Sequence, residues 1–146
     1  MTETTAKEQY VEFGIDAELY AIPIQDIDEV IKIQTITPLP TVREYVKGVI
    51  NLRGRIVPVI SLRCLLGLAD AEYTKSSRII VIHHRKESIG LIVDYVNKVT
   101  TFSDIQVPPE RIGGSTGGYF AGIGVSDHGL AGILRLEELL LYVQGR

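Results

Sequence analysis

The sequence of 146 residues contains a single cysteine, Cys64, so an internal disulfide is excluded. Cys64 lies within an apolar pattern formed by Leu62, Leu65 and Leu66. This pattern predicts a buried and inert thiol rather than a reactive one. The length is that of one domain, or of two small units that support each other, and is enough for a sizeable core.

The sequence also lacks a basic stripe and a long apolar run. Its net charge is −3, and the electrostatic pattern expected of a nucleic-acid-binding protein is missing. The apolar runs are shorter than the about 20 residues needed to cross a bilayer, and the polar N-terminus, TETTAKEQ, does not resemble a signal peptide. We therefore expect a soluble, cytoplasmic protein that does not insert into the membrane.

No catalytic constellation is apparent, because no nucleophile, base and orienting group come together in a motif. The glycine-rich loop at 113–118 lacks the Gly-Lys-Ser/Thr ending and the strand–loop–helix setting of a phosphate-binding loop. A flexible loop is the simpler interpretation. The sequence predicts that the protein is not an enzyme and has no cofactor.

The histidines and acidic residues do not suggest a metal site. His83 and His84 are neighbours in a predicted strand and so point to opposite faces, while His128 lies at a predicted turn. Three acidic residues cluster where another strand begins, which is typical of a solvated edge: Asp26, Asp28 and Glu29. We expect no bound metal.

What the sequence does contain is centred on the stretch from 46 to 66, VKGVINLRGRIVPVISLRCLL. It predicts a β-hairpin followed by a short helix that Ser61 caps. In the turn, Gly54 permits a positive φ and Asn51 can bond its own backbone. Arg53 at this tip is either a solvated turn residue or an exposed contact group. Pro58 predicts an edge or a bulge in the returning strand.

The other segments also alternate like strands. Hairpins are predicted at 10–24 and 79–93, a strand that ends near Ile33 follows a short helical turn, and 37–40 is extended because of its prolines. Residues 69–77 form a connector, and a helix is predicted at 136–143.

The two halves of the sequence match each other. A shift of 69 residues places 21–24 on 90–93, and a shift of 74 places 47–66 on 121–140 without gaps. Two copies of such a unit predict paired barrels or sandwiches rather than a solenoid. The same alignment places Lys98 opposite Glu29 and Asp127 opposite Arg53, so each half could hold its own salt bridge, with the signs exchanged. As a surface ion pair each would stabilise the fold little, and as a charged spot on an apolar rim each could bind a partner.

The stretch VKGVINLRGRIVPVISLRCLLGL resembles the signature hairpin of the CheW family of bacterial chemotaxis coupling proteins. The resemblance extends to AIPIQDIDEVIKI, ITPLP, IGLIVDYVNKV and YFAGIGVSDHGLAGILRLEELL, and so covers roughly residues 9 to 143. One departure is Ser61, where many members have an acidic residue.

The resemblance implies a mainly β fold with two five-stranded SH3-like β-barrels over a shared core and a short helix at the end of each repeat. Within one domain, 1–146, the subdomains would be 10–68 and 78–143, with strands possibly exchanged at the boundary. It also implies a non-enzymatic adaptor in the cytoplasm, at the inner face of the membrane, that links the cytoplasmic tips of transmembrane chemoreceptors to the regulatory domain of the histidine kinase CheA.

The resemblance further implies roles for individual residues. The implied receptor-binding residues are Ile27, Glu29, Arg53 and Val99. The residues implied to shape the hairpin are Gly48, Asn51 and Gly54. Ile24 and Ile27 match a kinase-contacting surface. We expect Glu29 and Arg53 to form a salt bridge.

Two other functions remain open at this point. The chain could be the equivalent module of a kinase or of a receiver-fused coupling protein, although its first residue, Met1, and its last, Arg146, suggest a separate protein. It could also be a small barrel enzyme or ligand-binding protein that uses the glycine-rich loop.

Overall fold

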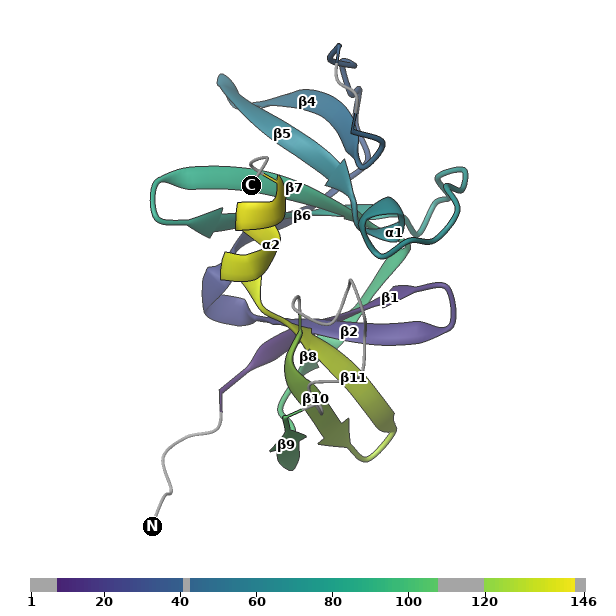
Figure 1. Cartoon of the computed structure of the whole chain (residues 1–146), viewed down its shortest axis with the longest axis vertical. Helices are drawn as coiled ribbons and strands as arrows, with labels where there is room; N and C mark the ends of the chain where they lie inside the picture. The colour runs from purple at the N-terminus through teal and green to yellow at the C-terminus, as the bar shows by residue number, and fades with distance from the viewer. Residues whose placement is uncertain (1–7, 41–42, 108–119, 144–146) are drawn as a thin grey trace.

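The computed structural model describes residues 8–40, 43–107 and 120–143 and shows a mainly β fold with two sheets. In Figure 1 the five-stranded sheet forms the upper part of the molecule and the six-stranded sheet the lower part. The five-stranded sheet has the order β3 (Ile27–Lys32), β6 (Arg78–His84), β7 (Glu87–Val93), β5 (Arg55–Ser61) and β4 (Val46–Leu52). The six-stranded sheet has the order β8 (Tyr95–Thr100), β1 (Tyr10–Ile15), β2 (Glu18–Pro23), β11 (Gly129–Leu134), β10 (Phe120–Ser126) and β9 (Asp104–Gln106).

Two short helices follow the β4–β5 and β10–β11 hairpins. They are α1 (Leu62–Leu65) and α2 (Leu136–Val143), and a 3₁₀ turn, η1 (Ile24–Asp26), precedes β3. Ser61 caps α1 as predicted, because its hydroxyl accepts a hydrogen bond from the Cys64 backbone N–H at 3.2 Å. The predicted helix at 136–143 is also confirmed.

The hairpin that opens each repeat joins the sheet of the other repeat. Strands β1 and β2 pair with β8 and β11, whereas β6 and β7 pair with β3 and β5. As hydrogen-bonded units, the sheets therefore cross the expected boundary between 10–68 and 78–143. Each sheet combines the opening hairpin of one repeat with the later strands of the other.

The strand pairings repeat with the offsets found in the sequence. Gly48 pairs with Val59, and Gly122 pairs with Ile133, with a bulge at the same place in both hairpins. The parallel pairs Val59–Gly90 and Ile133–Ala21 also correspond. The two copies are thus equivalent in register, as the gapless match predicted.

The sixth strand has a reduced counterpart in the other sheet. We expected five strands in each unit, and β9 adds one by pairing with β10 through Gln106 and Ile123. At the equivalent place in the first repeat, Thr37 forms a single bridge to Val49. The closure of either sheet into a barrel remains a prediction.

The main hydrophobic core joins the two sheets. Its buried side chains come from both sheets and both helices, including Phe13, Ile80, Leu91, Leu62 and Leu139. A second cluster, which includes Ile50 and Val81, lies in the five-stranded sheet, and a third, which includes Tyr10 and Phe102, lies in the six-stranded sheet. Because the central core draws on both repeats, neither repeat buries its apolar surface alone.

Candidate interaction site at the central hairpin

The predicted ion pair between Glu29 and Arg53 is present. An Nη2 nitrogen of Arg53 donates a hydrogen bond to Glu29 Oε2, which joins the tip of the β4–β5 hairpin to strand β3. The Arg53 side chain is 69% exposed and that of Glu29 is 26% exposed. This hydrogen bond, together with the negative charge of Glu29, raises the pKa of the Arg53 guanidinium. The cation is therefore presented to solvent but held in one orientation.

The turn that carries Arg53 has only two residues, Arg53 and Gly54, which adopt φ values of 52° and 87°. Positive φ at both central residues is the type I′ geometry that suits the twist of a hairpin. No conformational reason for Arg53 was apparent in the sequence, and the structure shows that it occupies a left-handed position. Asn51 Oδ1 accepts a hydrogen bond from the Gly54 N–H at 2.9 Å, as expected of a residue that bonds its own backbone.

Gly48 shapes the hairpin in a different way. It has a φ of 144°, and a Cβ atom added there would lie 2.1 Å from the Thr37 carbonyl oxygen. The close approach arises because Thr37 and Val49 exchange two backbone hydrogen bonds, of 2.8 and 2.9 Å. Only glycine fits at position 48.

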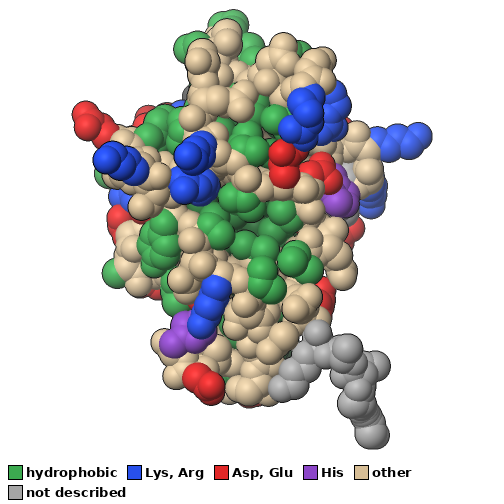
Figure 2. Space-filling model, turned by 180° about the vertical axis from the view of Figure 1, so that it is seen from behind, with side chains coloured by type: hydrophobic (Ala, Val, Ile, Leu, Met, Phe, Trp, Pro, Cys, Tyr) green, Lys and Arg blue, Asp and Glu red, His purple; other side chains and the backbone are tan. Residues whose placement is uncertain are grey.

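The apolar residues predicted for the site lie on the edge strands of different sheets. Ile27 is in β3 and packs partly against the central core, whereas Val99 is in β8 and is 48% exposed. Ile24, in η1, is also exposed. Figure 2 shows the face opposite to that of Figure 1, where hydrophobic side chains form an area bordered by acidic, basic and histidine side chains.

The structure does not bring Lys98 and Asp127 together. No ion pair joins these two described residues, so the second predicted salt bridge is wrong. A different contact occurs there: His128, which follows Asp127 in the turn, has its Nε2 3.0 Å from both carboxylate oxygens of Glu12, the residue that pairs with Lys98 across the β1–β8 ladder. Glu12 is fully buried, and the sequence analysis missed it. The 69-residue offset between the repeats aligns Glu12 with Val81, which is buried in the core. An acidic residue aligned with a core residue was therefore the signal in the sequence that could have revealed Glu12.

The other candidates for chemistry remain separate. His83 pairs with Asp28, with 2.6 Å between Nδ1 and Oδ1, and no group of three or more potential metal ligands occurs among the described residues. Cys64 is half-buried, which corrects the expectation of full burial: it lies at the surface of α1 in a pocket with Lys47 and Asp70. The glycine-rich loop at 113–118 lies outside the described residues.

Comparison with known proteins identifies the family. The model of the CheW-like domain matches residues 9–144. The chain belongs to the CheW family. The chemotaxis protein CheW of Helicobacter pylori is 37% identical over 134 residues, which cover 90% of this chain and 81% of the relative. The CheW protein of Thermotoga maritima is 33% identical over 90% of this chain and 87% of its own length.

A solved structure agrees with this assignment. The scaffolding protein TtCheW from Thermoanaerobacter tengcongensis superposes with a TM-score of 0.82 at 33% identity, over 93% of this chain and 89% of that CheW chain. The predicted family and the mainly β fold are therefore confirmed, and with them the assignment as a chemotaxis coupling adaptor. No helix in the described part of this CheW-family chain is long and apolar enough to span a membrane.

Proposed function

We propose that this chain links the cytoplasmic tips of chemoreceptors to the regulatory domain of the kinase CheA without catalysing a reaction. It would act in the cytoplasm, at the inner face of the membrane, through receptor arrays. The family assignment supports this proposal, as does the similarity to TtCheW, which is a scaffolding protein. The named relatives, which are coupling proteins matched over most of their length, favour this role over that of a kinase module.

We assign receptor binding to Glu29 and Arg53, together with the apolar residues Ile27 and Val99. The observation that carries this assignment is the exposed Arg53 guanidinium, which a carboxylate already orients. An oriented side chain loses less conformational entropy when a partner docks. The partly exposed Ile27, in the same strand as Glu29, and the exposed Val99 are apolar side chains that can receive the anchors of a helical receptor segment.

Kinase binding is assigned to Ile24 and Ile27. Ile24 is an exposed aliphatic residue in η1, and Ile27 follows at the start of β3, where it is only partly buried. Exposed aliphatic side chains that adjoin a packed core are suited to protein contacts. Ile27 would thus lie where the two proposed surfaces meet.

The proposal predicts that Arg53→Ala and Glu29→Ala each weaken binding to a chemoreceptor cytoplasmic fragment by about tenfold to a hundredfold. Binding to the CheA regulatory domain should change much less, and the melting temperature should remain nearly unchanged because the pair is exposed. Titration of each variant against both partners, together with a thermal melt, measures all three quantities.

Arg85→Ala is a matched control. Arg85 also occupies a left-handed position at the tip of a two-residue hairpin turn, with a φ of 60°, and forms an exposed ion pair with Glu137 at 3.8 Å. This control should bind the receptor fragment normally. Early melting of Arg53→Ala, or equal loss of both partners, would show that the Glu29–Arg53 pair belongs to the fold rather than to the receptor site.

A further inference from the structure

We propose that the groove between β5 and β7 binds an extended segment of a partner protein in which apolar and acidic side chains alternate. The groove is lined by residues other than those assigned above to the receptor or the kinase. The proposal therefore goes beyond the adaptor function and does not depend on it.

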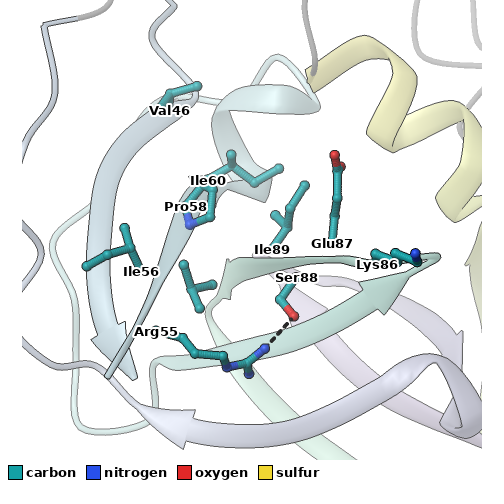
Figure 3. Close-up of a pocket in the computed structure, with 10 residues that line it drawn as sticks. Val46, Arg55, Ile56, Pro58, Ile60, Lys86, Glu87, Ser88 and Ile89 are labelled. Carbon is teal, nitrogen blue, oxygen red and sulfur yellow. Dashed lines mark hydrogen bonds between the residues drawn. The ribbon is translucent and has the colours of Figure 1, made fainter. Parts of the chain in front are cut away.

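The groove exists because two parallel strands pair along only part of their length. Strands β5 and β7 are paired from Val59 to Ser61 and from Gly90 to Ile92. Before these pairs the strands diverge, and residues 55–58 and 87–89 have ladder partners only on their outer sides, in β4 and β6. The resulting cavity has a volume of about 770 Å³ and opens to solvent (Figure 3).

The wall formed by β5 directs backbone groups of Ile56 into the groove. Val49 directs both its N–H and its C=O away from β5, because both bond to Thr37. In an antiparallel ladder the residue opposite, Pro58, must likewise direct its backbone away from β4 and toward β7. By the same alternation Ile56 directs both its N–H and its C=O into the groove, whereas Pro58 has no N–H and its C=O faces Gly90 at the first pair of the β5–β7 ladder.

The sequence predicted an edge or a bulge at Pro58, but β5 is an interior strand, paired with β4 on one side and β7 on the other, and the register shift of its ladder lies between Val46 and Gly48. The missing N–H of Pro58 is tolerated because it would face the groove, just before the first pair with β7.

The groove also offers apolar contacts. Val57, Ile60 and Ile89 are buried residues that line it, and Figure 3 shows Ile60 and Ile89 close together between the strands. Ile56 also lines the groove and is 64% exposed. An extended segment places every second side chain on the same face, so alternate apolar residues could cover this surface.

The charges at the groove favour an acidic occupant. Arg55 and Lys86 line it, against one carboxylate, Glu87. Arg55 donates a hydrogen bond to a neutral partner, Ser88 Oγ, at 3.2 Å. If a carboxylate of the bound segment replaced this hydroxyl as the acceptor, Arg55 would form a stronger, charge-assisted hydrogen bond. Arg85, in the adjoining turn, already lies 3.8 Å from Glu137.

An extended occupant fits better than a helix. A helix satisfies its own backbone and could not bond to the N–H and C=O of Ile56, whereas an added strand can. The other edge of the same hairpin shows this mode of pairing, because Thr37 bonds there to Val49 through both backbone groups.

The test uses a capped hexapeptide of alternating aspartate and valine, titrated into the isotope-labelled full-length protein and followed by NMR. We expect saturable shifts centred on the amides of Ile56 and Ile89. A peptide with lysine in place of aspartate, and one with alternate amides N-methylated, should each bind at least tenfold more weakly. Arg55→Glu and Ile56→Ser should weaken binding of the aspartate peptide by a similar factor.

Leu130→Ser is the matched control, because Leu130 occupies the position equivalent to Ile56 in the second repeat and is 61% exposed. It should leave binding unchanged, and urea unfolding should show that all three variants remain folded. The proposal is overturned if the aspartate peptide does not bind at millimolar concentration. It is also overturned if the lysine or N-methylated peptide binds equally well, or if Leu130→Ser weakens binding as much as Ile56→Ser does.

Discussion

Glu12 is a fully buried carboxylate held by two polar side chains. Asn97 Nδ2 donates a hydrogen bond to Glu12 Oε1 at 2.5 Å, and His128 Nε2 lies 3.0 Å from both carboxylate oxygens. These partners come from β8 and from the β10–β11 turn, so three elements meet at one carboxylate. A buried carboxylate is stable only when such partners are present. Asn97 and His128 are therefore structural residues of the six-stranded sheet.

This arrangement predicts an unusual double-variant result. His128→Ala should lower the free energy of unfolding by about 1–3 kcal/mol, because it leaves a buried acceptor without one of its partners. Adding Glu12→Val should restore part of that loss, since the equivalent position in the other sheet is occupied by the buried residue Val81. Urea unfolding of the two single variants and the double variant measures this coupling. Additive losses would contradict a structural role for the contact.

The β4–β5 hairpin contains two glycines with different functions. Gly54 adopts a φ of 87° and has no other atom within 4 Å of an added Cβ, so only its backbone conformation matters. Gly48 combines a φ of 144° with the close approach of the Thr37 carbonyl. One glycine forms the turn, and the other permits a neighbouring segment to bridge the strand.

We expect the two glycines to differ in their tolerance to substitution. Gly48→Ala should lower the free energy of unfolding by about 3 kcal/mol, because a methyl group would collide with backbone and separate Thr37 from Val49. Gly54→Asn should cost about 1 kcal/mol or less, because asparagine tolerates a left-handed φ and space is available. Urea unfolding gives both values, and hydrogen exchange at Val49 reports on the bridge. Equal costs would show that the approach of Thr37 does not restrict position 48.

At the scale of the whole molecule, the exchange of opening hairpins makes the two repeats interdependent. Each sheet contains strands of both repeats, and the central core lies between the sheets. Arg63 of α1 adds a polar link, because its Nη1 lies 2.7 Å from both Asp16 and Asp94. The hydrogen bond to Asp16 is the main reason that the pKa of Arg63 is raised.

This interdependence predicts that the isolated repeats do not fold. Fragments 1–76 and 77–146 should each lack cooperative thermal unfolding, because each would retain an opening hairpin whose partner strands lie in the other fragment. An equimolar mixture should recover near-native circular dichroism as the exchanged hairpins pair. A fragment that folds alone to a stable monomer would show that the hairpin can return to its own repeat.

The local elements and the duplication could be predicted from the amino-acid sequence. The Gly54 turn, the Ser61 cap and the strand alternation depend on neighbouring residues, so they could be predicted from short stretches. The offsets of 69 and 74 residues between the repeats also relate the paired residues of their strands. The Glu29–Arg53 pair was predicted through the family resemblance, because its partners are 24 residues apart in the sequence.

The pairing of the opening hairpins with the later strands, by contrast, could be established only from the folded molecule. The opening hairpins of the two repeats present equivalent backbone and apolar patterns, so alternation cannot distinguish pairing within a repeat from exchange between repeats. The same limit explains why the Glu12–His128 contact could not be predicted, since Glu12 and His128 come from different repeats and meet only after the exchange. Pairing between distant strands is selected by the burial of a common core, and that selection involves the whole chain at once.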